Sequence, residues 1–91
     1  MAGLGLTAAP ALANLKGDFS ASGVYIRQGP STGYPANGLG YPGQQQCTDT
    51  IVSGQPINGN YAWGHLRDIR TGVTGYSSEV YLYYYYPYQG C

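Results

Sequence analysis

The chain has 91 residues, a length that allows one small domain, and its four basic residues are balanced by four acidic ones. So few charges supply neither a basic surface for nucleic acid nor a polybasic patch for anionic lipid, and we expect neither partner. Fifteen glycines, six prolines and eleven tyrosines favour turns and short strands over helices.

The first thirteen residues differ in composition from the rest. Residues 1–13 (MAGLGLTAAPALA) carry no charge and end in Ala11-Leu12-Ala13, a triplet typical of a signal-peptide cleavage site. The stretch is too short to span a membrane as a helix and lacks a basic start. We interpret it as the remnant of a secretory signal peptide, with a secreted, extracellular or wall-associated mature chain from near Asn14. A flexible leader of small residues is the alternative.

The chain has two cysteines, Cys47 and Cys91. Two cysteines in a small exported chain usually pair, and this bridge would close a loop of about 45 residues, worth roughly 4 kcal/mol in the chain-entropy model. Two free thiols in a cytosolic protein are the alternative. We expect a monomer, although a bridge from Cys91 to a second chain would give a disulfide dimer.

The first half of the domain contains two predicted strands separated by a long loop. Residues 14–21 read as a lead-in. Val24 and Ile26 then alternate with polar neighbours, which predicts a strand over residues 24–27. Residues 29–43, rich in Gly, Pro, Ser and Asn, predict a long loop with turns, and residues 44–52 a second strand.

Turns and strands also alternate in the second half. Asn58-Gly59 is a strong signal for a hairpin turn. Residues 61–69 (YAWGHLRDI) predict a strand with Tyr61, Trp63 and Leu66 facing inward and His65 facing outward. After a turn at residues 70–75, the chain closes with a short irregular step and an extended run. Five or six short strands at this spacing predict an all-β fold, a small barrel or sandwich.

Candidate catalytic and metal-binding residues are few. Cys47 and His65 lack a third residue that would orient the histidine, as a nucleophilic pair requires. Asp49, Asp68 and Glu79 are isolated carboxylates. Two cysteines and one histidine do not have the spacing of a metal site. We therefore expect no enzyme activity, no metal and no cofactor.

The order and spacing of several motifs resemble the bacterial SH3 (SH3b) domain over residues 22–82. The opening VYIRQGPST (24–32) has the family's hydrophobic–x–hydrophobic–Arg–x–Gly–Pro–Ser–Thr pattern, and a turn glycine follows at Gly43. A strand with Trp63 and Leu66 comes next, and GYSSEVYL (75–82) matches the closing motif. Within that motif, Tyr76 replaces the usual tryptophan and Ser77 the usual valine or isoleucine.

The resemblance implies a small SH3-like barrel of five or six short strands with a tyrosine-rich tail at residues 83–91, in the form found in small exported actinobacterial proteins. The 29–43 loop would correspond to the family's large hairpin loop, which borders the ligand groove. The core residues expected on this basis are Val24, Ile26, Leu39, Val52, Trp63, Leu66, Val73, Tyr76, Val80 and Leu82.

Two roles are open for the tyrosines of the tail, which a Cys47–Cys91 bridge would hold against the sheet. They could fill a small core and cover a sheet edge. Alternatively, Tyr84 and Tyr86 could join Tyr34 and Tyr41 in a ligand groove, because tyrosine combines apolar area with a hydroxyl.

The resemblance implies a non-enzymatic binding module for cell-wall peptidoglycan or its peptide stems. The alternative is an extracellular protein–protein interaction or structural domain without a wall ligand. A third possibility is a companion of a wall hydrolase.

Overall fold

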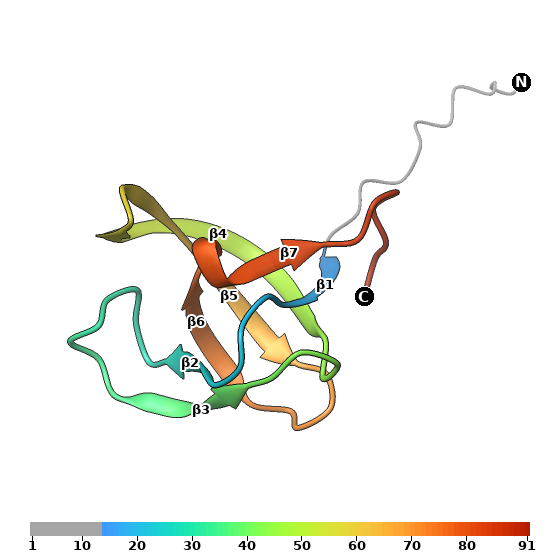
Figure 1. Ribbon diagram of the computed structural model, residues 1–91, viewed down its shortest axis with the longest axis horizontal. Coiled ribbons are helices and arrows are strands. Elements are labelled where there is room, and N and C mark those ends of the chain that lie inside the picture. The colour runs from blue at the N-terminus through green and yellow to red at the C-terminus, as the bar shows by residue number, and fades with distance from the viewer. Residues whose placement is uncertain (1–13) are drawn as a thin grey trace, which may run out of the picture.

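The computed structural model describes residues 14–91 as one antiparallel sheet of seven strands and a single 3-10 turn (Figure 1). The signal-peptide interpretation of residues 1–13 falls outside the described residues. The elements are β1 (Leu15–Phe19), β2 (Val24–Arg27), β3 (Ala36–Gly40), β4 (Gln46–Ile57), β5 (Asn60–Asp68), β6 (Thr74–Ser78), η1 (Glu79–Tyr81) and β7 (Leu82–Tyr84). The all-β prediction is confirmed, with seven strands instead of five or six.

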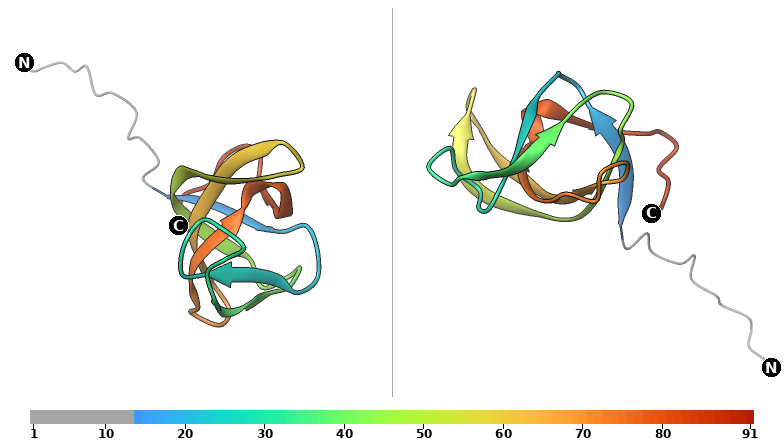
Figure 2. Two further views of the ribbon diagram at one scale, coloured as in Figure 1. Left: turned by 90° about the vertical axis from the view of Figure 1, so that its left-hand side faces the viewer. Right: turned by 90° about the horizontal axis from the view of Figure 1, so that it is seen from below.

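The sheet has the strand order β3-β2-β6-β5-β4-β1-β7 and curls into a half-barrel (Figure 2, right). The curl brings β1 toward β3, which lies five positions away in the sheet: a methyl group on Gly40 would overlap the ring of Phe19. The core inside the curl comprises Phe19, Val24, Ile26, Leu66 and Leu82. Each such side chain contributes about 1.5–3 kcal/mol by leaving water.

The prediction that residues 14–21 form a lead-in is wrong. They contain β1, which pairs with β4 on one side and with β7 on the other, and Phe19 is only 1% exposed. Alternation is hidden here because Gly17 and Asp18 occupy buried positions. A Cβ on Gly17 would overlap the carbonyl of Tyr83, so the two strands require glycine there.

The predicted 29–43 loop is also too long. Its residues 36–40 form β3, which pairs with β2 in the register Val24↔Gly40 and Ile26↔Gly38. Glycines suit this strand because neighbouring side chains occupy the space of a Cβ, namely Val73 at Gly38 and Phe19 at Gly40.

The β4–β5 hairpin turns at Asn58-Gly59, as predicted, with both residues in the left-handed region (φ 50° and 79°). β4, the first strand of this hairpin, extends to Ile57, whereas the predicted strand over residues 44–52 ends five residues earlier. Tyr61 was expected to face inward but is 59% exposed, and His65 is half-buried.

The expected core residues fall into three groups. Val24, Ile26, Trp63, Leu66 and Leu82 are buried. Val52, Val73, Tyr76 and Val80 are half-buried. Leu39 is exposed, because the Cα partners Tyr25 and Leu39 both lie on the outer side of the β2–β3 pair.

Candidate functional site

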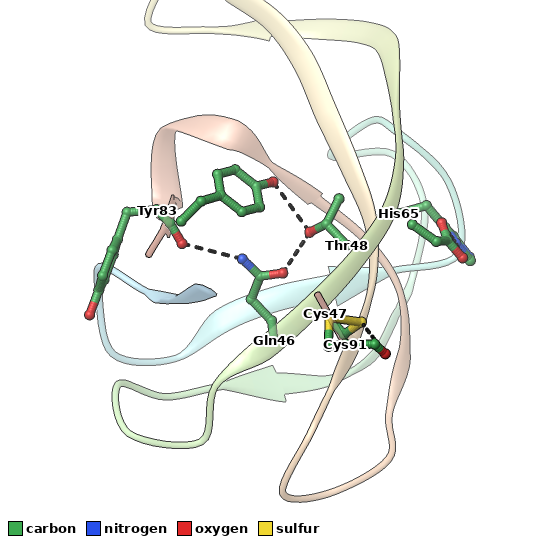
Figure 3. The surroundings of a disulfide bond; sticks show 8 residues. Gln46, Cys47, Thr48, His65, Tyr83 and Cys91 are labelled. Carbon is green, nitrogen blue, oxygen red and sulfur yellow. Dashed lines mark hydrogen bonds and ion pairs between the residues drawn. A yellow bond between two sulfur atoms is a disulfide. The ribbon is translucent and has the colours of Figure 1, made fainter. Parts of the chain in front are cut away.

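The C-terminal segment is fastened to the sheet by a disulfide between Cys47 of β4 and Cys91 (Figure 3). The two Cα atoms are 5.9 Å apart and the cysteines are 44 positions apart in the sequence. The predicted intrachain pairing is confirmed. Both thiols are consumed within one chain, so neither the free-thiol alternative nor a dimer bridged by Cys91 applies to this structure.

Backbone hydrogen bonds hold the same segment along β1. Lys16 N donates to Gln89 O (2.9 Å), and Tyr85 N donates to Lys16 O (3.2 Å). Leu15 and Gly90 form a further antiparallel bridge. Residues 85–90 therefore continue the edge that β7 forms beside β1, and the tail covers β-strand hydrogen-bonding groups that would otherwise be open.

Two tyrosines of the tail have partners in the body of the domain. The hydroxyl of Tyr84 donates to Glu79 Oε2 (2.7 Å) and lies 3.2 Å from Thr48 Oγ1. Burial raises the pKa of Tyr84, and its hydrogen bond to Glu79 raises it further. The hydroxyl of Tyr85 accepts a hydrogen bond from Gln45 Nε2 (2.9 Å). These rings fasten the tail to the domain.

The other tail tyrosines face solvent. Tyr83, Tyr86 and Tyr88 are 47%, 85% and 59% exposed. Tyr83 and Tyr85 pack edge to face with ring centres 6.0 Å apart, and Tyr86 and Tyr88 do so at 5.5 Å. The Tyr83 carbonyl accepts a hydrogen bond from Gln46 Nε2 (3.4 Å), and Thr48 Oγ1 donates to Gln46 Oε1 (2.5 Å), as Figure 3 shows.

A separate groove of about 360 Å³ opens beside β2, within the size range of small-ligand sites. It is lined by Ala21, Ser22, Gly23, Val24, Tyr25, Arg27, Thr32, Ile57, Trp63, Ser78 and Tyr81. Among these, Tyr25 and Tyr81 are exposed aromatic rings, whereas Trp63 is buried. Trp63 is fixed by a 2.7 Å hydrogen bond from Nε1 to Gln55 O.

Among residues 14–91, Arg27 is the only charged residue that lines this groove. Its guanidinium carbon lies 4.6 Å from the centre of the Tyr25 ring, two residues back on the same strand face. Its Nη1 donates to Tyr34 O (2.9 Å) and to Thr32 O (3.3 Å). The side chain thus connects the end of β2 to the β2–β3 loop.

The β2–β3 loop is also tied to the β4–β5 hairpin. The side-chain oxygen of Gln55 accepts hydrogen bonds from both Thr32 N and Thr32 Oγ1, each 2.8 Å long. Gln55 N donates to Pro30 O at 3.0 Å. With these contacts the loop forms a fixed wall of the groove.

The four tyrosines proposed from the sequence are not brought together. None of Tyr34, Tyr41, Tyr84 and Tyr86 lines the groove. The β2–β3 loop, which carries Tyr34, and the C-terminal segment lie at opposite ends of the molecule in Figure 1 and in the right-hand view of Figure 2. The ring of Tyr34 instead packs on Gly29. The hypothesis of one groove shared by all four therefore does not hold.

Sequence reasoning missed Tyr25 and Tyr81 as groove residues and treated Arg27 only as part of a motif. A signal was available for two of them: Tyr25 and Arg27 are the outward positions of VYIR, where an aromatic ring and a cation share one face. No local pattern places Tyr81 or Ile57 beside them.

His65 Nδ1 lies 2.9 Å from Asp49 Oδ1, and its ring packs against Tyr76 with ring centres 4.8 Å apart. The sulfur of nearby Cys47 is bonded to Cys91, so it is not available as a thiol. Over residues 14–91, no three His, Cys, Asp or Glu side chains gather as a metal site would require. In the same range no helix has the length and apolar character needed to cross a membrane.

Comparisons of the chain with protein-family models, with curated proteins and with solved structures found no match.

Proposed function

We propose that the chain is an exported, non-enzymatic binding module of the bacterial SH3 type, and that its groove takes cell-wall peptidoglycan or the peptide stems of that polymer. The observation that carries this proposal is the groove itself. Two exposed tyrosines and one arginine surround a hollow beside the β2–β3 loop, which is held to β2 by Arg27 and to the β4–β5 hairpin by Gln55.

The placement of the motif residues supports the SH3-type assignment. VYIR forms β2, and the following GPST forms the loop segment that carries Thr32 into the groove. Trp63 lies in β5 and lines the groove, and GYSS belongs to β6, which lies between β2 and β5. The resemblance implies a barrel of five or six short strands, and the curled antiparallel sheet of seven strands shares its all-β, curved architecture.

Export is supported by the disulfide, because bridges of this kind form and persist in oxidising compartments. Binding without catalysis is supported by the composition of the groove. Within the part of the chain that the structure describes, its lining offers aromatic, hydroxyl and guanidinium groups but no carboxylate, histidine or thiol to act as a base or nucleophile.

A pull-down of the full oxidised chain with insoluble purified peptidoglycan tests this function. We expect retention that falls when Tyr25 and Tyr81 are both replaced by alanine. The matched control is Tyr61→Ala, which removes an equally exposed ring from the β4–β5 hairpin outside the groove. Loss of retention in the control as well, or no retention of the unaltered chain, would contradict the proposal.

A second candidate function is binding to an extracellular protein through the exposed tail rings. Tyr83, Tyr86 and Tyr88 place three exposed phenols on one short segment held by the disulfide, and tyrosine is enriched at protein interfaces. If this second function holds, the double variant Tyr86→Ser, Tyr88→Ser no longer captures an extracellular protein in a pull-down. The double variant Tyr25→Ala, Tyr81→Ala, which alters only the groove, still captures that protein.

A further inference from the structure

The four carboxylate side chains of the chain are all engaged away from the groove. Asp18 accepts hydrogen bonds from Phe19 N, Gly43 N and Gln45 N. Asp49 pairs with His65. Asp68 accepts the backbone N–H groups of the turn that follows it. Glu79 accepts the hydroxyl of Tyr84.

As a result, Arg27 is a half-buried cation without an anionic partner. No carboxylate lies within ion-pair distance of it among residues 14–91. A guanidinium has five N–H donors. The two contacts to loop carbonyls both come from Nη1, and no acceptor within the described part of the chain engages Nε or Nη2. These two atoms form the side of a guanidinium that binds a carboxylate through two parallel hydrogen bonds.

We propose that Arg27 anchors a carboxylate of the ligand in this groove. The inference rests on the proposed binding function of the groove and specifies the ligand class: a short peptide or peptide-substituted sugar with one free carboxylate beside an uncharged body. Tyr81 and Ile57 would contact the uncharged part of the ligand. The Tyr25 ring, which packs against the Arg27 guanidinium, would keep that guanidinium in place.

The charge distribution favours a single carboxylate. Of the described residues, Arg27 alone carries charge in the lining, so a second anionic group on the ligand would have no cation to meet. A wholly neutral ligand would cover a half-buried guanidinium and leave three donors unpaired, which is costly. The two carbonyl contacts hold the side chain in one orientation before binding, so less side-chain entropy is lost when the carboxylate arrives.

The test compares two probes on the unaltered full chain by 1H–15N NMR titration: N-acetyl-dialanine with a free carboxylate and the same compound as its C-terminal amide. We expect shifts at residues 21–27, 32, 57, 78 and 81 with the acid, and about tenfold weaker binding of the amide. Binding of the acid should also weaken as salt is raised. Equal binding of acid and amide, or shifts elsewhere, would overturn the proposal.

Variants then assign the effect to the side chain. Arg27→Gln should reduce acid binding to the level of the amide, and Arg27→Lys should recover only part of it because lysine cannot form the two-pronged contact. Arg67→Gln removes the same charge from an exposed position of β5 and should change nothing. Amide signals of residues 28, 29 and 31–34, the non-proline positions of the loop, report whether the loop survives each change. The acid and the amide are compared on the unaltered chain. Equal binding of the two therefore contradicts the proposal even if every Arg27 variant has a disordered loop.

Inorganic phosphate and acetate, titrated separately, distinguish the anion. Phosphate and acetate are compared at the same concentration of negative charge. If phosphate displaces N-acetyl-dialanine more effectively than acetate does, the assignment to a carboxylate is overturned. The result is also separable from the proposed function. Wall retention that survives Arg27→Gln would contradict this inference and leave wall binding intact. If the chain binds the acid in preference to the amide but is not retained by the wall, this inference holds and the proposed wall binding is contradicted.

Discussion

The hydroxyl of Tyr84 and the carboxylate of Glu79 are joined by a 2.7 Å hydrogen bond that ties the last strand to the turn preceding it. A Cβ on Gly64 would overlap this carboxylate, so the backbone of β5 leaves the space that Glu79 occupies. The contact shows that Tyr84 has a structural role, whereas its neighbour Tyr86 stays in solvent.

The first prediction separates these two tyrosines. Tyr84→Phe should lower the free energy of unfolding by about 1–2 kcal/mol, because the half-buried Glu79 loses its hydrogen-bond donor. Tyr86→Phe removes the same atom from an exposed ring and should change stability by less than about 0.5 kcal/mol. Urea denaturation of the two variants measures both values, and equal effects would contradict the assigned roles.

Glu79 gives the second prediction, a pH dependence. Burial raises its pKa above the usual value of 4.5, and the hydrogen bond from Tyr84 opposes this rise only in part. The folded state therefore holds the proton more tightly than the unfolded state. The contribution of Glu79 to stability is complete below pH 4.5 and is lost as pH rises through its folded pKa.

Glu79→Gln should remove this dependence, because the amide does not ionise. The stability of the original chain minus that of the variant should fall as pH increases from about 4 to 7. Thermal melts at several pH values measure the difference. A difference that rises over this range would show that the folded pKa is lowered instead.

The third prediction concerns the disulfide. Replacing Cys47 and Cys91 together with serine opens a loop of 44 positions and should lower the free energy of unfolding by about 3–4 kcal/mol. The groove lies away from the tail, so N-acetyl-dialanine should still bind under conditions where the variant stays folded. Loss of binding by a folded variant would show that the tail supports the groove.

A fourth prediction tests whether β1 belongs to the domain. Phe19→Ala should destabilise the protein by about 3–5 kcal/mol, since the ring is fully buried between strands that are not adjacent in the sheet. A chain starting at residue 22, which lacks β1, should not fold. The exposed Tyr88 provides the control, and Tyr88→Ala should be nearly neutral in the same denaturation experiment.

The sequence predicted the elements whose local pattern matches their environment. Val24 and Ile26 alternate with outward residues and form β2, and Asn58-Gly59 forms the hairpin turn. The two missed strands contain glycines or a buried carboxylate where a hydrophobic side chain is expected. Asp18 is buried because it accepts hydrogen bonds from the turn before β4, a contact across more than twenty residues that no local pattern reveals.

The candidate site was less predictable than the fold for a similar reason. The groove combines residues from the β1–β2 connection, β2, the hairpin and η1, so it exists only after the sheet curls. The sequence indicates tyrosines as binding residues because each ring combines apolar area with a hydroxyl, but this property does not show which rings are exposed. Which tail tyrosines are exposed and which have partners depends on the strand that the tail follows. The tail follows β1, and the disulfide to Cys47 holds it there.

The last prediction tests the curl itself. Gly40→Ala should destabilise the domain by about 2–3 kcal/mol, because the new methyl group would overlap the Phe19 ring and force β1 and β3 apart. Gly33→Ala adds the same group in the β2–β3 loop, where the nearest atom, Ser31 Oγ, is 3.4 Å away, and should cost little. If the Gly40 variant is as stable as the Gly33 variant, Phe19 of β1 does not pack against Gly40 of β3, and the half-barrel is too open to bring these two strands together. If the Gly40 variant regains stability when Phe19 is also replaced by leucine, the overlap with the ring is the cause of the loss.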